Sequence, residues 1–283
     1  MPAVVQHYKM FDGRLFIITL FDIIQVLGDT PKQFVKERTN MKKLIALAMS
    51  SVMVLSMAAC ASTTETTESS VDYAAKSEGV MTYAEYASAD LDTEVVIEAY
   101  VQDKQTWWDD KATVYLADPD GAYFAYNMAC SESDYDLLVE GQKIKVTGYK
   151  SEWSGEVEIV DGTFVVEDGN WIADYTDLTE LFKNSATELI NHQNEKFQIM
   201  GCTVATDPIF SWDGSGSEGD DIYFDVQVGD ETYTMTVESY LTGSGSPIYE
   251  VAKTLEVGDQ ITLGGYLYWY EGPNPHITLI RGK

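Results

Sequence analysis

The stretches "EGQKIKVTGYKSEWSGEVEIV" (residues 140–160) and "VGDQITLGGYLYWYEGPNPHITLI" (residues 257–280) follow one pattern. In both, apolar and polar residues alternate toward a Gly-Tyr pair, in which Gly148 matches Gly265, and a second alternating run follows a turn. Such alternation is typical of β-strands with one buried face. Because the pattern occurs only twice, it predicts a duplicated domain and not a solenoid, which would need a longer series of repeats.

The same order of elements precedes each copy. We expect strands at 94–102, 112–118, 121–128, 142–150 and 156–166, and again at 195–205, 221–228, 231–238, 259–268 and 275–281. A short helix should begin after the third strand, with Ser131 and Ser246 as N-caps. Gly141 and Gly258 should end these helices. Three strands, a helix and two strands is the order of the OB-fold, a small Greek-key barrel.

The predicted fold is therefore mainly β, with two tandem OB-fold five-stranded Greek-key barrels that each carry one short helix. The first barrel is expected at residues 81–170 and the second at residues 195–283. Residues 171–194 contain a helical pattern and are expected to form a linker between the barrels.

The segment "MKKLIALAMSSVMVLSMAACAS" (residues 41–62) has the layout of a secretory signal, with two lysines, a short apolar run and small residues before Cys60. Its end resembles the bacterial lipobox, and the chain resembles uncharacterised bacterial secreted lipoproteins with tandem OB-fold domains. The resemblance implies removal of residues 41–59 and attachment of a diacylglycerol to Cys60. It also implies a membrane-anchored, extracytoplasmic location, with residues 60–80 as a lipidated, disordered tether.

Residues 1–40 precede this signal and need their own explanation. We expect Met41 to be the true start and residues 1–40 to be translated upstream DNA, a mis-assigned start. The alternative is a genuine extension in which residues 14–28 form an amphipathic or membrane helix, although Asp22 in its middle opposes a membrane span.

Acidic residues dominate the chain, with 46 Asp and Glu against 18 Lys and Arg and a formal net charge of −28. Such a charge repels phosphate backbones and disfavours nucleic acid as a partner. Cys130 and Cys202 each lie in or beside an apolar run, which favours buried free thiols and leaves a disulfide between them open.

Aromatic residues gather where OB-folds bind ligands, on the second and third strands and on two neighbouring loops. Their flat faces suit stacking against sugars or bases. The alternative is that several of them, Trp153 and Trp269 in particular, form cross-strand pairs that stabilise a hairpin. The candidate ligand-binding residues are Trp107, Trp108, Tyr126, Trp153, Trp212, Tyr223, Tyr268, Trp269 and Tyr270.

The loop "DGSGSEGDD" (residues 213–221) offers carboxylates at Asp213, Asp220 and Asp221, and calcium is the one cofactor for which the sequence holds a weak candidate. The loop lacks the acidic residue of an EF-hand at its twelfth position, where Phe224 stands. A plain acidic loop is the alternative.

No nucleophile elbow, P-loop or zinc-protease motif occurs, so we expect no enzymatic activity. The expected function is a lipid-anchored, extracytoplasmic binding protein that engages a glycan or a protein on aromatic-lined barrel faces. One alternative is binding of single-stranded nucleic acid, which the fold suggests by analogy. The other is a structural or assembly role without a small ligand, which low exposure of Trp107, Trp108, Trp212 and Trp269 would favour.

Overall fold

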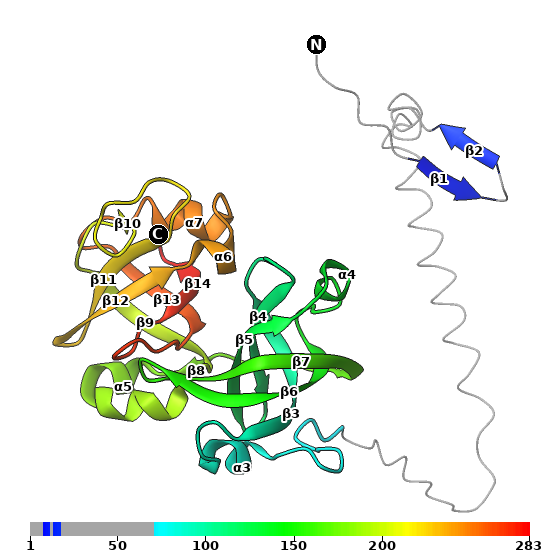
Figure 1. Ribbon diagram of the computed structural model, residues 1–283. Coiled ribbons are helices and arrows are strands. Elements are labelled where there is room, and N and C mark those ends of the chain that lie inside the picture. The colour runs from blue at the N-terminus through cyan, green and yellow to red at the C-terminus, as the bar shows by residue number, and fades with distance from the viewer. Residues whose placement is uncertain (1–7, 12–13, 18–70) are drawn as a thin grey trace, which may run out of the picture. The chain divides into compact units, whose positions relative to one another are not determined.

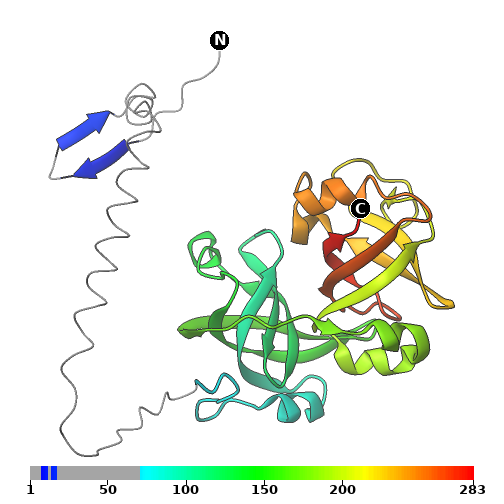
Figure 2. The ribbon, with the colours of Figure 1, turned by 180° about the vertical axis from the view of Figure 1, so that it is seen from behind.

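The computed structural model describes residues 8–11, 14–17 and 71–283 (Figures 1 and 2). Strands β1 (Tyr8–Phe11) and β2 (Arg14–Ile17) pair antiparallel and belong to a first unit, and Ser70–Lys283 form a second, compact unit. The predicted signal peptide and Cys60 lie outside the described residues. In the described part of the chain, no helix is long and apolar enough to cross a membrane.

The first sheet of the compact unit is a closed five-stranded barrel with the strand order β3-β4-β5-β7-β6. Its elements are α3 (Tyr83–Ser88), β3 (Glu94–Lys104), β4 (Lys111–Asp118), β5 (Gly121–Ala129), α4 (Glu132–Tyr135), β6 (Gln142–Trp153) and β7 (Glu156–Asn170). Strand β3 closes the barrel because its first part pairs with β6 and its last part pairs with β4. The prediction of a mainly β fold with a five-stranded barrel of OB-fold order is thus confirmed for this half.

The second sheet has seven strands in the order β10-β11-β12-β14-β13-β9-β8. Strand β9 pairs with both β13 and β11, so β9, β11, β12, β14 and β13 also follow one another in a ring of pairings. The elements are β9 (Lys196–Val204), β10 (Ile209–Phe210), β11 (Ile222–Val228), β12 (Glu231–Val237), α6 (Ser239–Thr242), α7 (Pro247–Ala252), β13 (Gln260–Tyr266) and β14 (His276–Arg281).

The matching glycines of the repeat lie where two strands cross closely. A Cβ atom on Gly148 would come within 2.8 Å of the carbonyl oxygen of Val160, and one on Gly265 would overlap the carbonyl oxygen of His276. The strand register shifts at both places, beside Gly148 in β6 and beside Gly265 in β13. Close approach of two backbones therefore explains why the pattern needs glycine at these positions.

The predicted helix starts are confirmed, whereas the predicted ends are wrong. Ser131 and Ser246 accept hydrogen bonds from the third backbone N–H of α4 and α7. The helices end several residues before Gly141 and Gly258, and these glycines lie in turns just before β6 and β13. Their N–H groups donate to the carbonyls of Val101 in β3 and Val204 in β9, so both glycines hold the chain against the far end of a strand.

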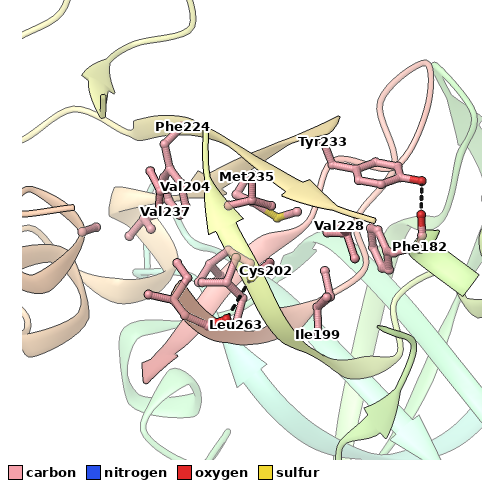
Figure 3. Close-up of a cluster of buried hydrophobic side chains, with 14 of the residues drawn as sticks. Phe182, Ile199, Cys202, Val204, Phe224, Val228, Tyr233, Met235, Val237 and Leu263 are labelled. Atoms are coloured by element: carbon pink, nitrogen blue, oxygen red, sulfur yellow. Dashed lines mark hydrogen bonds between the residues drawn. The ribbon is translucent and has the colours of Figure 1, made fainter. Parts of the chain in front are cut away.

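Each sheet encloses its own apolar core. Figure 3 shows the core of the second sheet, where Cys202 lies among aliphatic side chains and its thiol donates to the Ile261 carbonyl at 3.2 Å. Cys130 packs in the core of the first barrel. Both thiols are free, and burial raises the pKa of each to about 11, so neither is a reactive thiolate at neutral pH.

Residues 171–194 do not form the simple helical linker that the sequence predicts. They contain β8 (Thr176–Asp177), α5 (Thr179–Asn184) and a 3-10 helix (Ala186–His192), and β8 pairs parallel with β9. The side chains of Leu178, Phe182 and Leu189 are buried in the core of the second sheet. The segment is helical as the pattern predicts, but its apolar face packs on the second core and does not simply connect the two halves.

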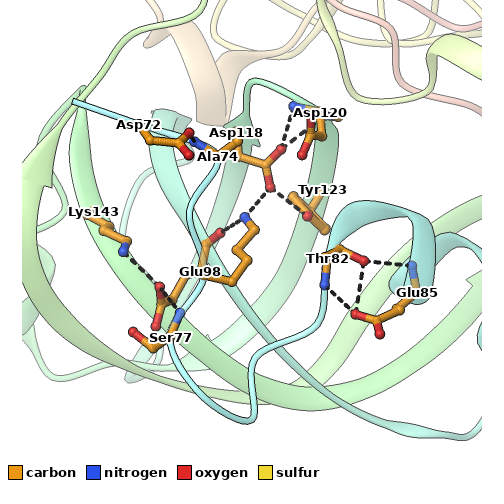
Figure 4. Close-up of polar contacts among 12 residues, drawn as sticks. Asp72, Ala74, Ser77, Thr82, Glu85, Glu98, Asp118, Asp120, Tyr123 and Lys143 are labelled. Carbon is orange, nitrogen blue, oxygen red and sulfur yellow. Dashed lines mark hydrogen bonds and ion pairs between the residues drawn. The ribbon is translucent and has the colours of Figure 1, made fainter. Parts of the chain in front are cut away.

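Residues 71–80, predicted as part of a disordered tether, lie against the first barrel (Figure 4). Lys76 Nζ pairs with the buried Asp118 carboxylate at 2.5 Å and donates to the Glu98 carbonyl at 2.7 Å. Burial opposes ionisation of Glu98, but hydrogen bonds from Lys143, Ser77 and Lys145 lower its pKa to about 2. We call residues 71–80 the strap, because a buried ion pair and hydrogen bonds to Glu98 attach it to the barrel.

The close crossing at Gly265 gives a test of the fold. We expect Gly265→Ala to reduce the free energy of unfolding by about 3 kcal/mol, because the new methyl group must push two paired strands apart. Gly201→Ala is the matched control, since open space surrounds that glycine and its positive φ alone should cost about 1 kcal/mol. Urea unfolding of both variants measures the difference, and equal losses would contradict the explanation.

Candidate binding cleft

A seam of stacked aromatic rings joins the two sheets. Tyr115 of β4 stacks on Tyr266 of β13, with ring centroids 4.3 Å apart and planes 13° apart. The Tyr266 hydroxyl donates to the Gln102 carbonyl at 3.0 Å, and the Tyr115 hydroxyl lies 2.8 Å from His276 Nδ1. Both tyrosines are buried, so the seam fixes one sheet against the other through apolar contact and satisfied polar groups.

Further hydrogen bonds join loops of the two halves on either side of the seam. The backbone N–H of Thr106 donates to the Tyr240 carbonyl at 2.6 Å, and the side chain of Gln105 donates to both oxygens of Glu238. At the other end, the N–H of Glu271 donates to the Ser154 carbonyl at 2.7 Å. These contacts position loops that surround a cleft.

The cleft has a volume of about 1230 Å³ and is lined by residues of both sheets. The first half contributes Gln105, Thr106, Trp108, Lys111, Thr113, Phe124, Tyr126, Asn127 and Trp153. The second half contributes Thr206, Asp207, Ile209, Trp212, Asp221, Tyr223, Phe224, Asp225, Thr234, Thr236, Glu238, Tyr240, Tyr268, Tyr270, Asn274 and His276. A cleft of this size accommodates several planar rings or a short polymer segment.

Seven of the nine aromatic residues proposed from the sequence line this one cleft: Trp108, Tyr126, Trp153, Trp212, Tyr223, Tyr268 and Tyr270. Trp108 is 66% exposed and Trp212 is 77% exposed, and they come from corresponding loops of the two halves. The Trp153 and Tyr270 rings lie 5.1 Å apart, one from each half. The sequence placed these residues on two separate faces, whereas the structure brings them together.

The other two proposed residues, Trp107 and Trp269, are not among the residues that line the cleft. The Trp107 indole donates to the Cys130 carbonyl at 2.9 Å and packs on the core of the first barrel. Trp269 packs against the second core. Low exposure of four tryptophans would have favoured a purely structural role. Two of them, Trp108 and Trp212, are exposed in the cleft, and the other two, Trp107 and Trp269, are half-buried against the cores.

Sequence reasoning missed Phe124, Tyr240 and His276 as cleft residues. Phe124 is buried against Tyr268, with ring centroids 5.4 Å apart, and forms part of the floor. Tyr240 lies in α6, a helix that the sequence did not predict, and His276 is the first residue of β14. Only His276 carried a usable signal, because it opens the last strand directly after the aromatic loop of the repeat.

Carboxylates surround the cleft, and basic groups are scarce. Asp207, Asp221, Asp225 and Glu238 contribute acidic side chains, and Lys111 is the one lysine or arginine among the described lining residues. Burial and the neighbouring Asp221 raise the pKa of Tyr223, and burial likewise raises the pKa of Tyr268, so both phenols keep their protons. The aromatic walls are therefore uncharged and the rim is negative.

The calcium prediction finds no support in the described residues. Asp213 accepts hydrogen bonds from both the N–H and the hydroxyl of Ser215, and Asp221 accepts two from Ser239. Asp220 accepts one from the N–H of Ser217. Asp213 and Asp220 thus hold local turns, and Asp221 holds the first residue of α6. Across residues 8–11, 14–17 and 71–283 no cluster of three His, Cys, Asp or Glu is arranged to bind a metal.

Glu156 is a fully buried carboxyl group between the two halves. Its oxygens accept hydrogen bonds from Asn194 Nδ2 at 2.6 Å and from the Trp269 N–H at 2.9 Å. Burial raises its pKa to about 8, in spite of these two donors, and the nearby Glu158 adds to the effect. Asn194 Oδ1 is buried without a partner, and a protonated Glu156 would have a hydroxyl to donate to it after rotation of that amide.

We expect Glu156 to make stability fall as pH rises from about 4.5 to about 8. In that range the folded state keeps the proton that the unfolded state has released, so each pH unit costs up to about 1.4 kcal/mol. Glu156→Gln, which is permanently neutral, should flatten this profile and be the more stable form at pH 8. Urea unfolding at pH 5, 6.5 and 8 tests this, with the exposed Glu152→Gln as control; parallel profiles for Glu156→Gln and wild type would refute it.

No protein-family model matches the chain, and no curated protein is similar to it in sequence. Among solved structures, a murine DNA-binding protein bound to double-stranded DNA is 12% identical, with a TM-score of 0.31 over 64% of this chain and 90% of that one. A replication protein A heterotrimer bound to single-stranded DNA is 15% identical, with a TM-score of 0.29 over 68% and 52%. The Thermus aquaticus single-stranded DNA-binding protein is 13% identical, with a TM-score of 0.24 over 67% and 92%.

These findings run against two expectations from the sequence. The similar structures are of DNA-binding proteins, so the comparisons do not support the preference for a glycan or a protein as the ligand. They likewise do not support the expectation that the negative net charge makes nucleic acid an unlikely partner.

Proposed function

We propose that the chain is a tandem pair of OB-folds and that the cleft between them binds a short single-stranded oligonucleotide without catalysing a reaction. The ring of pairings in the second sheet, which repeats the strand order of the first barrel, supports the tandem arrangement. Residues of both halves line the cleft, so the binding site requires both.

The observation that carries the proposal is the meeting of exposed aromatic side chains from both halves in one cleft. Trp108 and Trp212 are mostly exposed, and Tyr126, Trp153 and Tyr270 are each about half exposed. Large aromatic surface left open to water in a concave site is typical of a binding surface. Unstacked bases present flat faces of matching size, and each base that stacks on an aromatic ring contributes about 1–3 kcal/mol.

The acidic rim sets how such a strand would lie. Carboxylates repel phosphates, so the bases would point inward onto the aromatic rings while the sugar-phosphate backbone stays in solvent. Binding would then owe little to counterion release, which dominates most protein–nucleic acid complexes. A short oligonucleotide fits this arrangement better than a long duplex.

We expect the Trp108→Ala, Trp212→Ala double variant to bind a fluorescent thymidine decamer at least tenfold more weakly than the wild type, because two stacking faces are lost. Fluorescence anisotropy measures the affinity. Tyr149→Ala, which removes an exposed ring outside the cleft, is the matched control and should bind as the wild type does.

The salt dependence should distinguish stacking from electrostatic binding. With one lysine in the cleft, log K against log salt should have a slope no steeper than about −0.7, and screening of the acidic rim should push it toward zero or above. A slope of −3 or steeper, or an unaffected double variant, would refute the proposed mode, and no measurable binding would refute the function.

We also propose that Cys60 carries a lipid and anchors the protein on the outer side of a bacterial membrane, as the signal at residues 41–59 suggests. Metabolic labelling with an alkyne fatty acid in a bacterial host should label the wild type and not Cys60→Ser. Intact mass should give a mature chain that begins at Cys60. A labelled Cys60→Ser variant, or a mature chain that retains residues before Met41, would contradict this prediction.

A further inference from the structure

The floor of the cleft contains hydrogen-bonding groups that the protein itself does not use. His276, the first residue of β14, stacks on Tyr268 with ring centroids 4.4 Å apart and meets the edge of Tyr115. Its Nδ1 atom lies 2.8 Å from the Tyr115 hydroxyl and 3.3 Å from Glu238 Oε2. The imidazole ring is thus held in one orientation from three sides.

These contacts determine which nitrogen of His276 carries a proton. Tyr115 is buried, burial raises its pKa well above the ordinary value, and His276 Nδ1 is the acceptor within reach of its hydroxyl. A proton on Nδ1 alone would leave that buried hydroxyl without an acceptor. Nε2 therefore carries a hydrogen, both in the favoured neutral tautomer and in the charged ring.

Nε2 of His276 has no hydrogen-bond acceptor within residues 71–283, and it is not among the buried atoms that lack a partner there. The ring lines the cleft, so this N–H is open to a ligand in the cleft. A donor that is fixed in direction and left unpaired at the floor of a binding cleft contributes to specificity.

Asn274 supplies a second donor, two residues from His276 along the chain. Its Oδ1 atom accepts from the Thr236 hydroxyl at 2.7 Å, and its NH₂ group makes no hydrogen bond in the described part of the protein. Asn274 and His276 flank Pro275. Both line the cleft.

Two neighbouring donors fit a base edge with two neighbouring acceptors. Guanine presents O6 and N7 side by side, whereas adenine places an amino group next to N7. In thymine, a methyl group or an N–H lies beside each carbonyl. Cytosine has N3 next to O2, but its single ring offers a smaller face to Tyr268 and to the tryptophans of the cleft. All edges of a base are accessible in a single strand.

Resting on the proposed oligonucleotide binding, we propose that His276 Nε2 and Asn274 Nδ2 form a base-reading pair that selects guanine through O6 and N7. Stacking holds any base, and this pair discriminates among bases at one position. The acidic rim does not oppose this contact, because the reading edge of guanine is uncharged.

Competition binding to thymidine decamers that carry one central guanine, adenine, cytosine, thymine or 7-deazaguanine tests the proposal. We expect the guanine decamer to bind about tenfold more tightly than the other three natural ones, since a bidentate base contact discriminates by about that factor. Replacing N7 by C–H in 7-deazaguanine should remove most of the preference.

Two variants keep the test independent of folding. Asn274→Ala removes the donor, and Asn274→Asp keeps its size and the contact with Thr236 but replaces the donor by an acceptor. Both should lose the guanine preference, while the distant control Asn184→Ala should bind every decamer as the wild type does. A preference for cytosine, an unchanged affinity for 7-deazaguanine, or a guanine preference that survives Asn274→Ala would overturn the base-reading pair while leaving oligonucleotide binding intact. If no decamer binds, the proposed function itself fails.

Discussion

The stacking of Tyr115 on Tyr266 is the contact on which the geometry of the cleft depends. It joins β4 of the first barrel to β13 of the second sheet, and both rings are buried. Because each hydroxyl also has a partner, the contact combines apolar burial with fixed direction. The exposed walls of the cleft take their separation from this buried seam, which is why aromatic residues far apart in sequence face one another.

Much of the fold was accessible from the sequence because local physics dictates it. The alternation of apolar and polar residues predicted the strands, and Ser131 and Ser246 predicted where two helices begin. Gly148 and Gly265 are needed because two backbones cross closely at each of them. The segments that were wrongly described depend on distant partners. The strap is ordered because Lys76 meets Asp118, and an amphipathic segment read as a linker covers a core through Phe182.

The candidate site was partly predictable for a related reason. Trp108 and Trp212 were found because they occupy corresponding loops of a repeat, and large aromatic residues in loops require an explanation. They share one cleft because the seam brings the two halves together. The sequence did not predict this, because the seam pairs residues about 150 positions apart and no local sequence pattern marks such a contact. Trp107 and Trp269 instead pack on the two cores, because sequence alone does not show on which side of a loop a ring packs.

The seam is also asymmetric. Tyr149 and Tyr266 occupy the same place in the repeat, yet Tyr266 is 2% exposed in the seam while Tyr149 is 45% exposed. The two halves therefore meet head to tail, with unlike faces in contact, and no two-fold axis relates them. Such a contact leaves one face of each half unpaired. The first half still exposes Tyr149, whereas the matching Tyr266 of the second half is buried in the seam. Because both faces belong to one chain, the interface does not need to be self-complementary.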